Sequence, residues 1–171
     1  VTEGRYSAPY TPDGVYAVLT SIVANRKRLV RGITQIKNRF ARWFAIYFPE
    51  YKGIYTHIDA KGGMLVLKTA PTPEEIIKLG EDGVIQIWKE AKLRGNGHKK
   101  AMLIVNAASQ SIGLTEGLEE ARMEIQDLIE DYELQMKRLE KVNSLIENLC
   151  KQIKYVDKLL EIKGIGIITV A

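Results

Sequence analysis

The sequence predicts a mainly α protein: an extended helical fragment with a long coiled-coil helix and helix-hairpin-helix turns. Three observations predict this fold. Apolar residues recur every three or four positions over two long stretches, glycines separate shorter helical stretches between them, and two similar Gly-x-Gly sequences interrupt the helical pattern. The chain therefore divides into a basic amphipathic helix over 1–48, a short-helix connector over 49–113, a coiled-coil helix over 114–156 and the start of a second hairpin over 157–171.

The composition is that of a globular protein. The 171 residues are 46% hydrophobic and 27% charged, and no apolar run approaches the roughly 18 residues that predict a membrane span. Cys150, the only cysteine, has no partner for a disulfide and no Cys or His residues at zinc-binding spacing. We therefore expect a cytoplasmic protein with no membrane partner.

Residues 1–48 predict one long helix with two faces. The sequence Thr11-Pro12-Asp13-Gly14 places a capping hydroxyl before a proline at the first helical position, and Pro49 predicts the end of the helix. An apolar stripe follows the helix at Ile22, Leu29, Ile33, Ile36, Phe40, Trp43 and Tyr47. A second face carries Arg28, Arg31, Arg39 and Arg42, which are the residues that we expect to contact a nucleic-acid backbone.

The connector predicts short helices joined by glycine turns. Residues 50–70 sustain no period, and they predict a loop with at most one partly helical piece. The sequence Thr72-Pro73-Glu74-Glu75 predicts a helix start with a capping box. We expect Gly80 and Gly83 to break this helix, Asp82 to cap a further helix to about Leu93, and another helix over Lys99–Ile112.

After Gly113 a charged, nearly heptad pattern predicts the coiled coil. We expect its seam to make a homodimer or a higher oligomer, with the helices either parallel or antiparallel. The alternative is that the helix packs within its own domain. The seam consists of Ile125, Leu128, Tyr132, Met136, Leu139, Val142, Ile146, Leu149 and Ile153. The acids of residues 116–133 are interpreted as a solvated flank of this helix.

Two similar glycine hairpins are the most specific chemical feature. Each has an apolar residue, a base and then Gly-x-Gly before a helix, and the first amides of such a helix can hold a phosphate. A helix-helix turn without a ligand is an equal alternative for each. The candidate phosphate-binding residues are Arg94, Gly95, Gly97, Lys99 and Lys100 in the first hairpin, and Lys163, Gly164 and Gly166 in the second.

Charge is distributed unevenly along the chain. Residues 1–48 carry eight Lys or Arg against two Asp or Glu, whereas residues 115–150 carry four against ten. The basic half is therefore expected to meet a polyanion. His57 and His98 have no neighbours at catalytic or metal-binding spacing, so we assign no catalytic residue and no metal ligand in this chain.

Several short runs resemble one protein family. They are Glu3–Ser7, Phe48–Tyr51, Leu67–Glu74, Ala91–Gly95 and Leu160–Gly166. Together they resemble the middle of a bacterial insertion-sequence transposase with an N-terminal RuvC-like DEDD domain, a central coiled coil and a C-terminal serine-containing domain. In that arrangement, residues 1–48 are the tail of the RuvC-like domain and residues 157–171 open the C-terminal transposase domain.

The resemblance implies DNA recombination guided by a structured bridge RNA. It also implies a divalent metal such as Mg²⁺ and a serine nucleophile in the parent enzyme, with the carboxylates expected before Val1 and the serine after Ala171. The expected partners of this fragment are therefore DNA, structured guide RNA and a second copy. Two other interpretations are a purely structural coiled-coil protein and a helix-hairpin-helix subunit of a repair nuclease.

Overall fold

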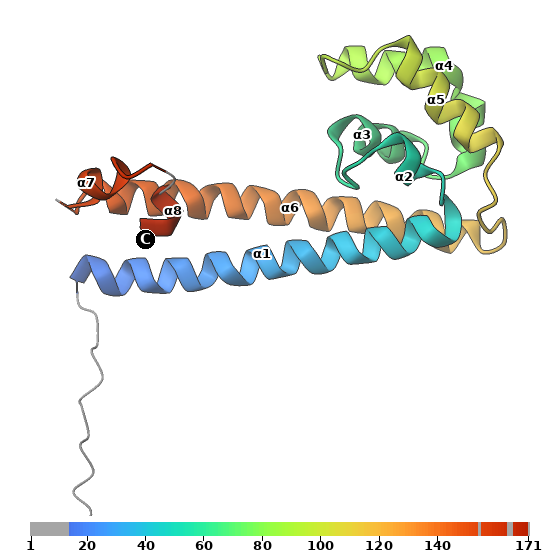
Figure 1. Ribbon diagram of the computed structural model, residues 1–171. Helices are drawn as coiled ribbons and strands as arrows, with labels where there is room; N and C mark the ends of the chain where they lie inside the picture. Colours follow the sequence, from blue (N-terminus) through green and yellow to red (C-terminus); the bar gives the residue numbers. More distant parts are fainter. Residues whose placement is uncertain (1–13, 154, 164–165, 171) are drawn as a thin grey trace, which may run out of the picture. The chain divides into compact units, whose positions relative to one another are not determined.

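The computed structural model describes residues 14–153, 155–163 and 166–170 (Figure 1). These residues form eight helices and no strand, which confirms the mainly α prediction. The chain divides into two compact units, one taking in residues up to Arg31 and from Gln135 onward, the other Gly32–Leu134. The long helices α1 (Gly14–Tyr47) and α6 (Leu118–Cys150) contribute to both units. The predicted cap at Thr11–Asp13 lies outside the described residues.

In the first unit, the beginning of α1 lies antiparallel to the end of α6. Arg26 on α1 donates from Nε to Oδ1 of Asn143 on α6 at 2.9 Å. Leu19, nearer the start of α1, packs in one apolar cluster with Cys150 at the end of α6. The short helices α7 (Val156–Leu160) and α8 (Ile167–Val170) add partly buried apolar side chains to that cluster.

In the second unit, the end of α1 supplies most of the aromatic core. Phe40, Trp43 and Phe44 are almost completely buried, and the Phe44 ring stacks on that of Tyr51 at 4.0 Å between centroids. Trp43 donates from Nε1 to the Ala121 carbonyl of α6 at 2.8 Å, which fixes the two helices against each other at this point.

The connector contains four helices in the second unit. They are α2 (Tyr51–Ile54), α3 (Lys61–Thr69), α4 (Pro73–Glu90) and α5 (His98–Ser109). The predicted capping box is confirmed: Thr72 Oγ1 accepts from the Glu75 amide, and the Glu75 carboxylate accepts from the Thr72 amide. The predicted break is confirmed at Gly80, which has non-helical angles of φ 67° and ψ 177°, but it is wrong at Gly83, which lies within the helix.

The prediction of a loop over 50–70 is wrong for much of that range, because α2 and α3 lie there. The glycines of α3 serve close packing and do not reverse the chain. A Cβ on Gly63 would lie 2.0 Å from the Tyr51 hydroxyl, and one on Gly62 would lie 2.8 Å from Oδ1 of Asn96. The Gly62 carbonyl also accepts a hydrogen bond from Nε1 of Trp88 on α4 at 2.8 Å.

The helix predicted to end near Leu93 ends at Glu90. Lys92 adopts a left-handed φ of 51°, and its amide donates to the Lys89 carbonyl. The Leu93 amide donates to the Trp88 carbonyl at 2.9 Å, which completes a Schellman-type termination. A lysine thus stands at the position that glycine most often takes, which is why the sequence pattern placed the end too late.

Candidate nucleic-acid interface

The predicted basic face of α1 is exposed in the first unit. Arg28 and Arg31 are both exposed, and neither forms an ion pair with a carboxylate in the described part of the chain. They lie three residues apart on one helix, so their Cα atoms are separated by about 4.5 Å along the axis. Arg26 differs from them because it is half-buried and holds Asn143.

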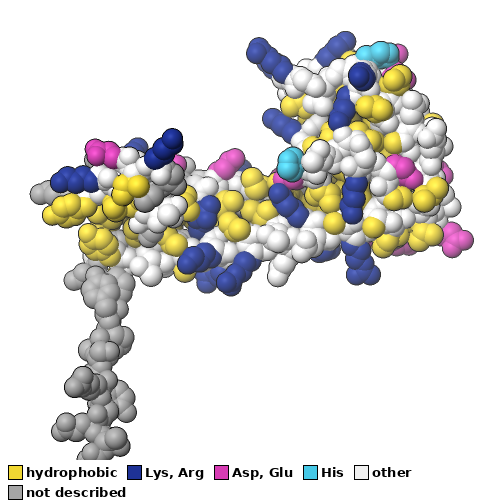
Figure 2. Space-filling model, viewed as in Figure 1, with side chains coloured by type: hydrophobic (Ala, Val, Ile, Leu, Met, Phe, Trp, Pro, Cys, Tyr) yellow, Lys and Arg dark blue, Asp and Glu magenta, His cyan; other side chains and the backbone are white. Residues whose placement is uncertain are grey.

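The second unit contains the other two predicted arginines. Arg39 and Arg42 are also exposed, while Phe40 and Trp43 beside them are buried. One guanidinium nitrogen of Arg39 lies 4.0 Å from the Glu124 carboxylate, a long and exposed ion pair. Figure 2 shows Lys and Arg side chains along α1 and around the connection between α4 and α5.

The first glycine hairpin connects α4 to α5 in an antiparallel pair. Gly95 has a left-handed φ of 84°, and Gly97 is the extended residue that precedes α5, where it provides no side-chain cap. The first amides of any α-helix lack acceptors within the helix. The backbone here is therefore compatible with a phosphate or with water, and the phosphate role of Gly95 and Gly97 stays a prediction.

The cations of this hairpin divide into exposed and engaged groups. Arg94 and Lys99 are exposed. Lys100 is half-buried: its ammonium donates to the Ile54 carbonyl and lies 4.6 Å from the centroid of the Tyr55 ring. Burial raises the pKa of Tyr55 to about 12, so its ring stays a neutral surface for the ammonium at physiological pH. Lys100 thus holds α5 against α2, whereas Arg94 and Lys99 face solvent.

The second predicted hairpin is described only in part. Gly164 and Ile165 lie outside the described residues, and Lys163 is exposed. Gly166 precedes α8, a helix of four residues, and its carbonyl accepts from the Thr169 amide at 2.8 Å. The helix-hairpin-helix form is therefore not established for this segment.

The predicted dimerisation seam is covered by α1 of the same chain. In the second unit Ile125 and Leu128 are completely buried beside Phe40, and the Tyr132 ring meets the Phe40 ring edge-on at 6.2 Å. In the first unit Val142 and Ile146 are buried in one cluster with Leu19. Along the rest of the seam, Met136, Leu139, Leu149 and Ile153 are half-buried. A homodimer through these residues stays a prediction, and it would require α1 to leave the seam.

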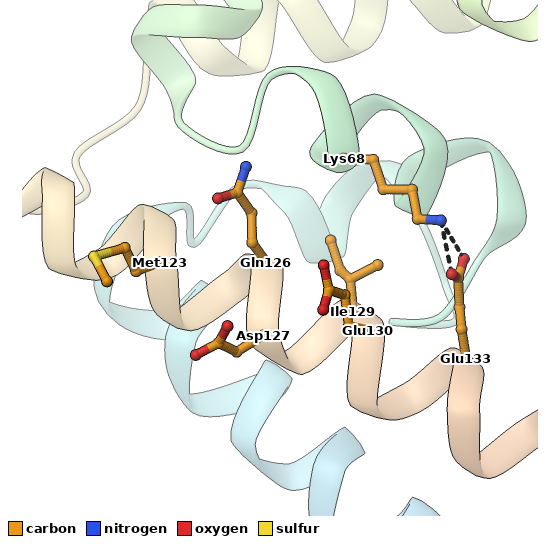
Figure 3. Close-up of a pocket in the computed structure, with 7 residues that line it drawn as sticks. All are labelled: Lys68, Met123, Gln126, Asp127, Ile129, Glu130 and Glu133. Carbon is orange, nitrogen blue, oxygen red and sulfur yellow. Dashed lines mark hydrogen bonds and ion pairs between the residues drawn. The ribbon is translucent and has the colours of Figure 1, made fainter.

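An acidic groove beside α6 is a feature that the sequence did not reveal. It lies in the second unit, has a volume of about 680 Å³, and is bordered by α6 and by Lys68 from α3 (Figure 3). The α6 side of the groove consists of Met123, Gln126, Asp127, Ile129, Glu130 and Glu133. The sequence displays the spacing of the acids along one helix, but the opposite wall of the groove is Lys68, which is distant from them along the chain.

Comparison with known proteins identifies no relative: no protein-family profile, no curated protein and no solved structure matches this chain. Among the described residues, no cluster of three or more His, Cys, Asp or Glu side chains is arranged to hold a metal ion. None of the described helices is both long enough and apolar enough to cross a membrane.

Proposed function

We propose that this chain is the central nucleic-acid-binding segment of a cytoplasmic DNA transposase, in which the basic face of α1 holds the backbone of a structured RNA. The observation that carries the proposal is the separation of the two faces of α1. Phe40 and Trp43 of the apolar stripe are buried, whereas Arg28, Arg31, Arg39 and Arg42 are all exposed. The transposase context comes from the sequence runs that resemble that family.

Backbone phosphates suit this arginine face for a physical reason. A guanidinium group can donate two parallel hydrogen bonds to one phosphate, and it keeps its charge at every physiological pH. Arg28 and Arg31 have no carboxylate partner in the described chain, so binding a phosphate would not cost them an existing ion pair. Contacts of this kind give affinity with little dependence on base sequence.

The connection between α4 and α5 offers a second, smaller contact. Arg94 and Lys99 are exposed on either side of Gly95 and Gly97, and the first amides of α5 follow directly. A phosphate there would meet two positive side chains and the positive end of a helix dipole. We propose that this hairpin adds affinity to the arginine face of α1.

The salt dependence of binding tests the proposal. We expect the Arg31→Ala, Arg42→Ala double variant to flatten the plot of log affinity against log salt by roughly 1.5, because two phosphate contacts no longer release counterions. Binding should weaken equally for unrelated sequences. Fluorescence anisotropy with a structured RNA hairpin and a DNA duplex of equal length would measure both effects and reveal which polymer is preferred.

A matched control removes the same charge elsewhere. Lys137 and Lys141 are exposed on α6, and their double alanine variant should leave the slope close to that of the wild type. The Arg31→Lys, Arg42→Lys variant should keep the slope and lose affinity, since lysine cannot make the bidentate contact. An unchanged slope in the double alanine variant would mean that this face is only solvated surface.

A structural interaction protein is the second candidate. The packing of α1 on α6 favours it, because in each unit the two helices share an apolar cluster that needs no nucleic acid to form. Weak RNA and DNA binding with little salt dependence would support this candidate over the first.

A further inference from the structure

The acidic groove beside α6 is an open surface, and every charged side chain on its α6 side is acidic. Asp127 and Glu130 are exposed on its α6 side and form no ion pair with a cation in the described chain. Met123, 64% exposed, borders the same groove, and the buried side chain of Ile129 lies between the acids. An occupant would therefore meet negative charge next to a flexible apolar surface.

The groove already holds one cation of its own chain. Figure 3 shows Lys68 reaching from α3 to Glu133, with its ammonium 2.7 Å from both carboxylate oxygens. Asp127 and Glu130 continue the same row toward the N-terminus of α6, at steps of three residues, without such a partner. Glu133 at one end of the row therefore has a cation partner, whereas the next two acids, Glu130 and Asp127, have none in the described chain.

The chain contains a basic pair with the spacing of these two acids. Arg28 and Arg31 are three residues apart on α1, as Asp127 and Glu130 are on α6, so each pair spans about 4.5 Å of helix axis. Of the neighbours of these arginines, Ala24 and Gln35 are exposed and uncharged, and Lys27 is exposed and adds a third positive charge. Two helices could therefore approach with both arginines opposite both acids.

We propose that the occupant of the groove is a second copy of this chain, with its Arg28 and Arg31 on Asp127 and Glu130. The buried seam residues of α6, which are Ile125, Leu128, Val142 and Ile146, pack in clusters with α1, so self-association through them would displace α1. The groove and the arginine pair are complementary in charge and spacing, and Met123 can pack against the aliphatic stems of the arginines.

Charge reversal with mixing tests the contact. The Arg28→Glu, Arg31→Glu variant and the Asp127→Lys, Glu130→Lys variant should each be monomeric in sedimentation velocity, because like charges then face each other. Their equimolar mixture should form a heterodimer, since each copy then supplies one native and one exchanged surface. The wild type should be a dimer that dissociates as salt is raised. All samples are free of nucleic acid, so the result is independent of the proposed RNA contact.

A control variant, Glu140→Lys with Glu147→Lys, changes the same charge at exposed positions of α6 outside the groove and should remain a dimer. Circular dichroism checks that every variant keeps its helix content. A wild type that stays monomeric at its highest soluble concentration in low salt would overturn the proposal. It would also be overturned by reversal variants that still dimerise alone, or by a mixture that remains monomeric.

Discussion

Gly113 is a single residue on which the passage from α5 to α6 depends. A Cβ at this position would lie 2.1 Å from the Tyr47 carbonyl oxygen, and the next residue, Leu114, donates its amide to the Ile46 carbonyl at 2.9 Å. Because the obstacle is backbone, it cannot rotate away. We expect Gly113→Ala to lower the free energy of unfolding by about 1 to 3 kcal/mol, measured by urea denaturation.

Gly32→Ala is the matched control for this substitution. Gly32 lies inside α1, and no heavy atom lies within 4 Å of the Cβ that alanine would add there. Alanine should therefore raise the free energy of unfolding by about 0.5 to 1 kcal/mol through helix propensity. If the two variants were equally stable, the close approach at Gly113 would not exist in solution.

Asp59 is a residue whose ionisation should matter for acid stability. Its Oδ2 accepts from the Tyr132 hydroxyl at 2.5 Å and pairs with Nζ of Lys37 at 2.8 Å. Burial raises the pKa of Asp59, but the hydrogen bonds from Lys37 and Tyr132 lower it by more, so the pKa is below its ordinary value of 3.8. A lowered folded pKa contributes stability above the unfolded pKa, and that contribution is lost as pH falls through the folded value.

We therefore expect Asp59→Asn to lower the free energy of unfolding by about 1 kcal/mol at neutral pH, given the partial exposure of the pair. The difference from wild type should shrink as pH falls below the ordinary carboxyl pKa of 3.8 and through the lower pKa of the folded state. Urea denaturation over a pH series measures it. A difference that stays constant down to the lowest pH would show that the Asp59 carboxylate is not stabilised by these partners.

At the scale of elements, the sequence predicted the helices that carry a long period or an explicit cap. The apolar stripe identified α1, and Thr72 with Glu75 identified the start of α4. It missed α2 and α3 because they are short and because Gly62 and Gly63 look like chain-breaking residues when their packing partners are unknown. Those partners, Asn96 and Tyr51, come from other elements.

The candidate site was predictable to the same extent. The exposure of the α1 arginines follows from the period of one helix, so the sequence alone could place them. The position of Lys100 does not follow from a helical period, because its ammonium is held by the carbonyl of Ile54 on α2 and by the ring of Tyr55, the residue after α2. The acidic groove was missed for a similar reason, because its opposite wall is Lys68.

The pairing of α1 with α6 can be tested at two adjacent residues. Ile146 is completely buried in the core of the first unit, whereas Leu145 is 51% exposed. Ile146→Asp should cost several kcal/mol of unfolding free energy, since it buries an unpaired carboxylate, whereas Leu145→Asp should cost less than about 1 kcal/mol. Thermal unfolding followed by circular dichroism would compare the two. Equal melting temperatures would contradict the intramolecular seam.

At the scale of the whole molecule, charge is separated along the chain. Residues 1–48 have an excess of basic over acidic side chains and residues 115–150 an excess of acidic ones, although the formal net charge of the chain is only +4. Such a chain can bind a polyanion and can also bind a copy of itself, and Arg28 and Arg31 take part in both proposed contacts. A guanidinium pair that faces two carboxylates cannot hold two phosphates at the same time, so the two associations should exclude each other at these residues.

Competition between RNA and self-association is the consequence that can be measured. We expect a structured RNA in excess to convert the wild-type dimer into complexes with one protein copy, because RNA carries more negative charge than the two acids of the groove. The Asp127→Asn, Glu130→Gln variant, which lacks the groove charge, should bind RNA with an affinity that does not fall as protein concentration rises. Sedimentation velocity with labelled RNA follows both species. Dimers that bind RNA without dissociating, with Arg28 and Arg31 still required for each association, would contradict the shared use of this pair.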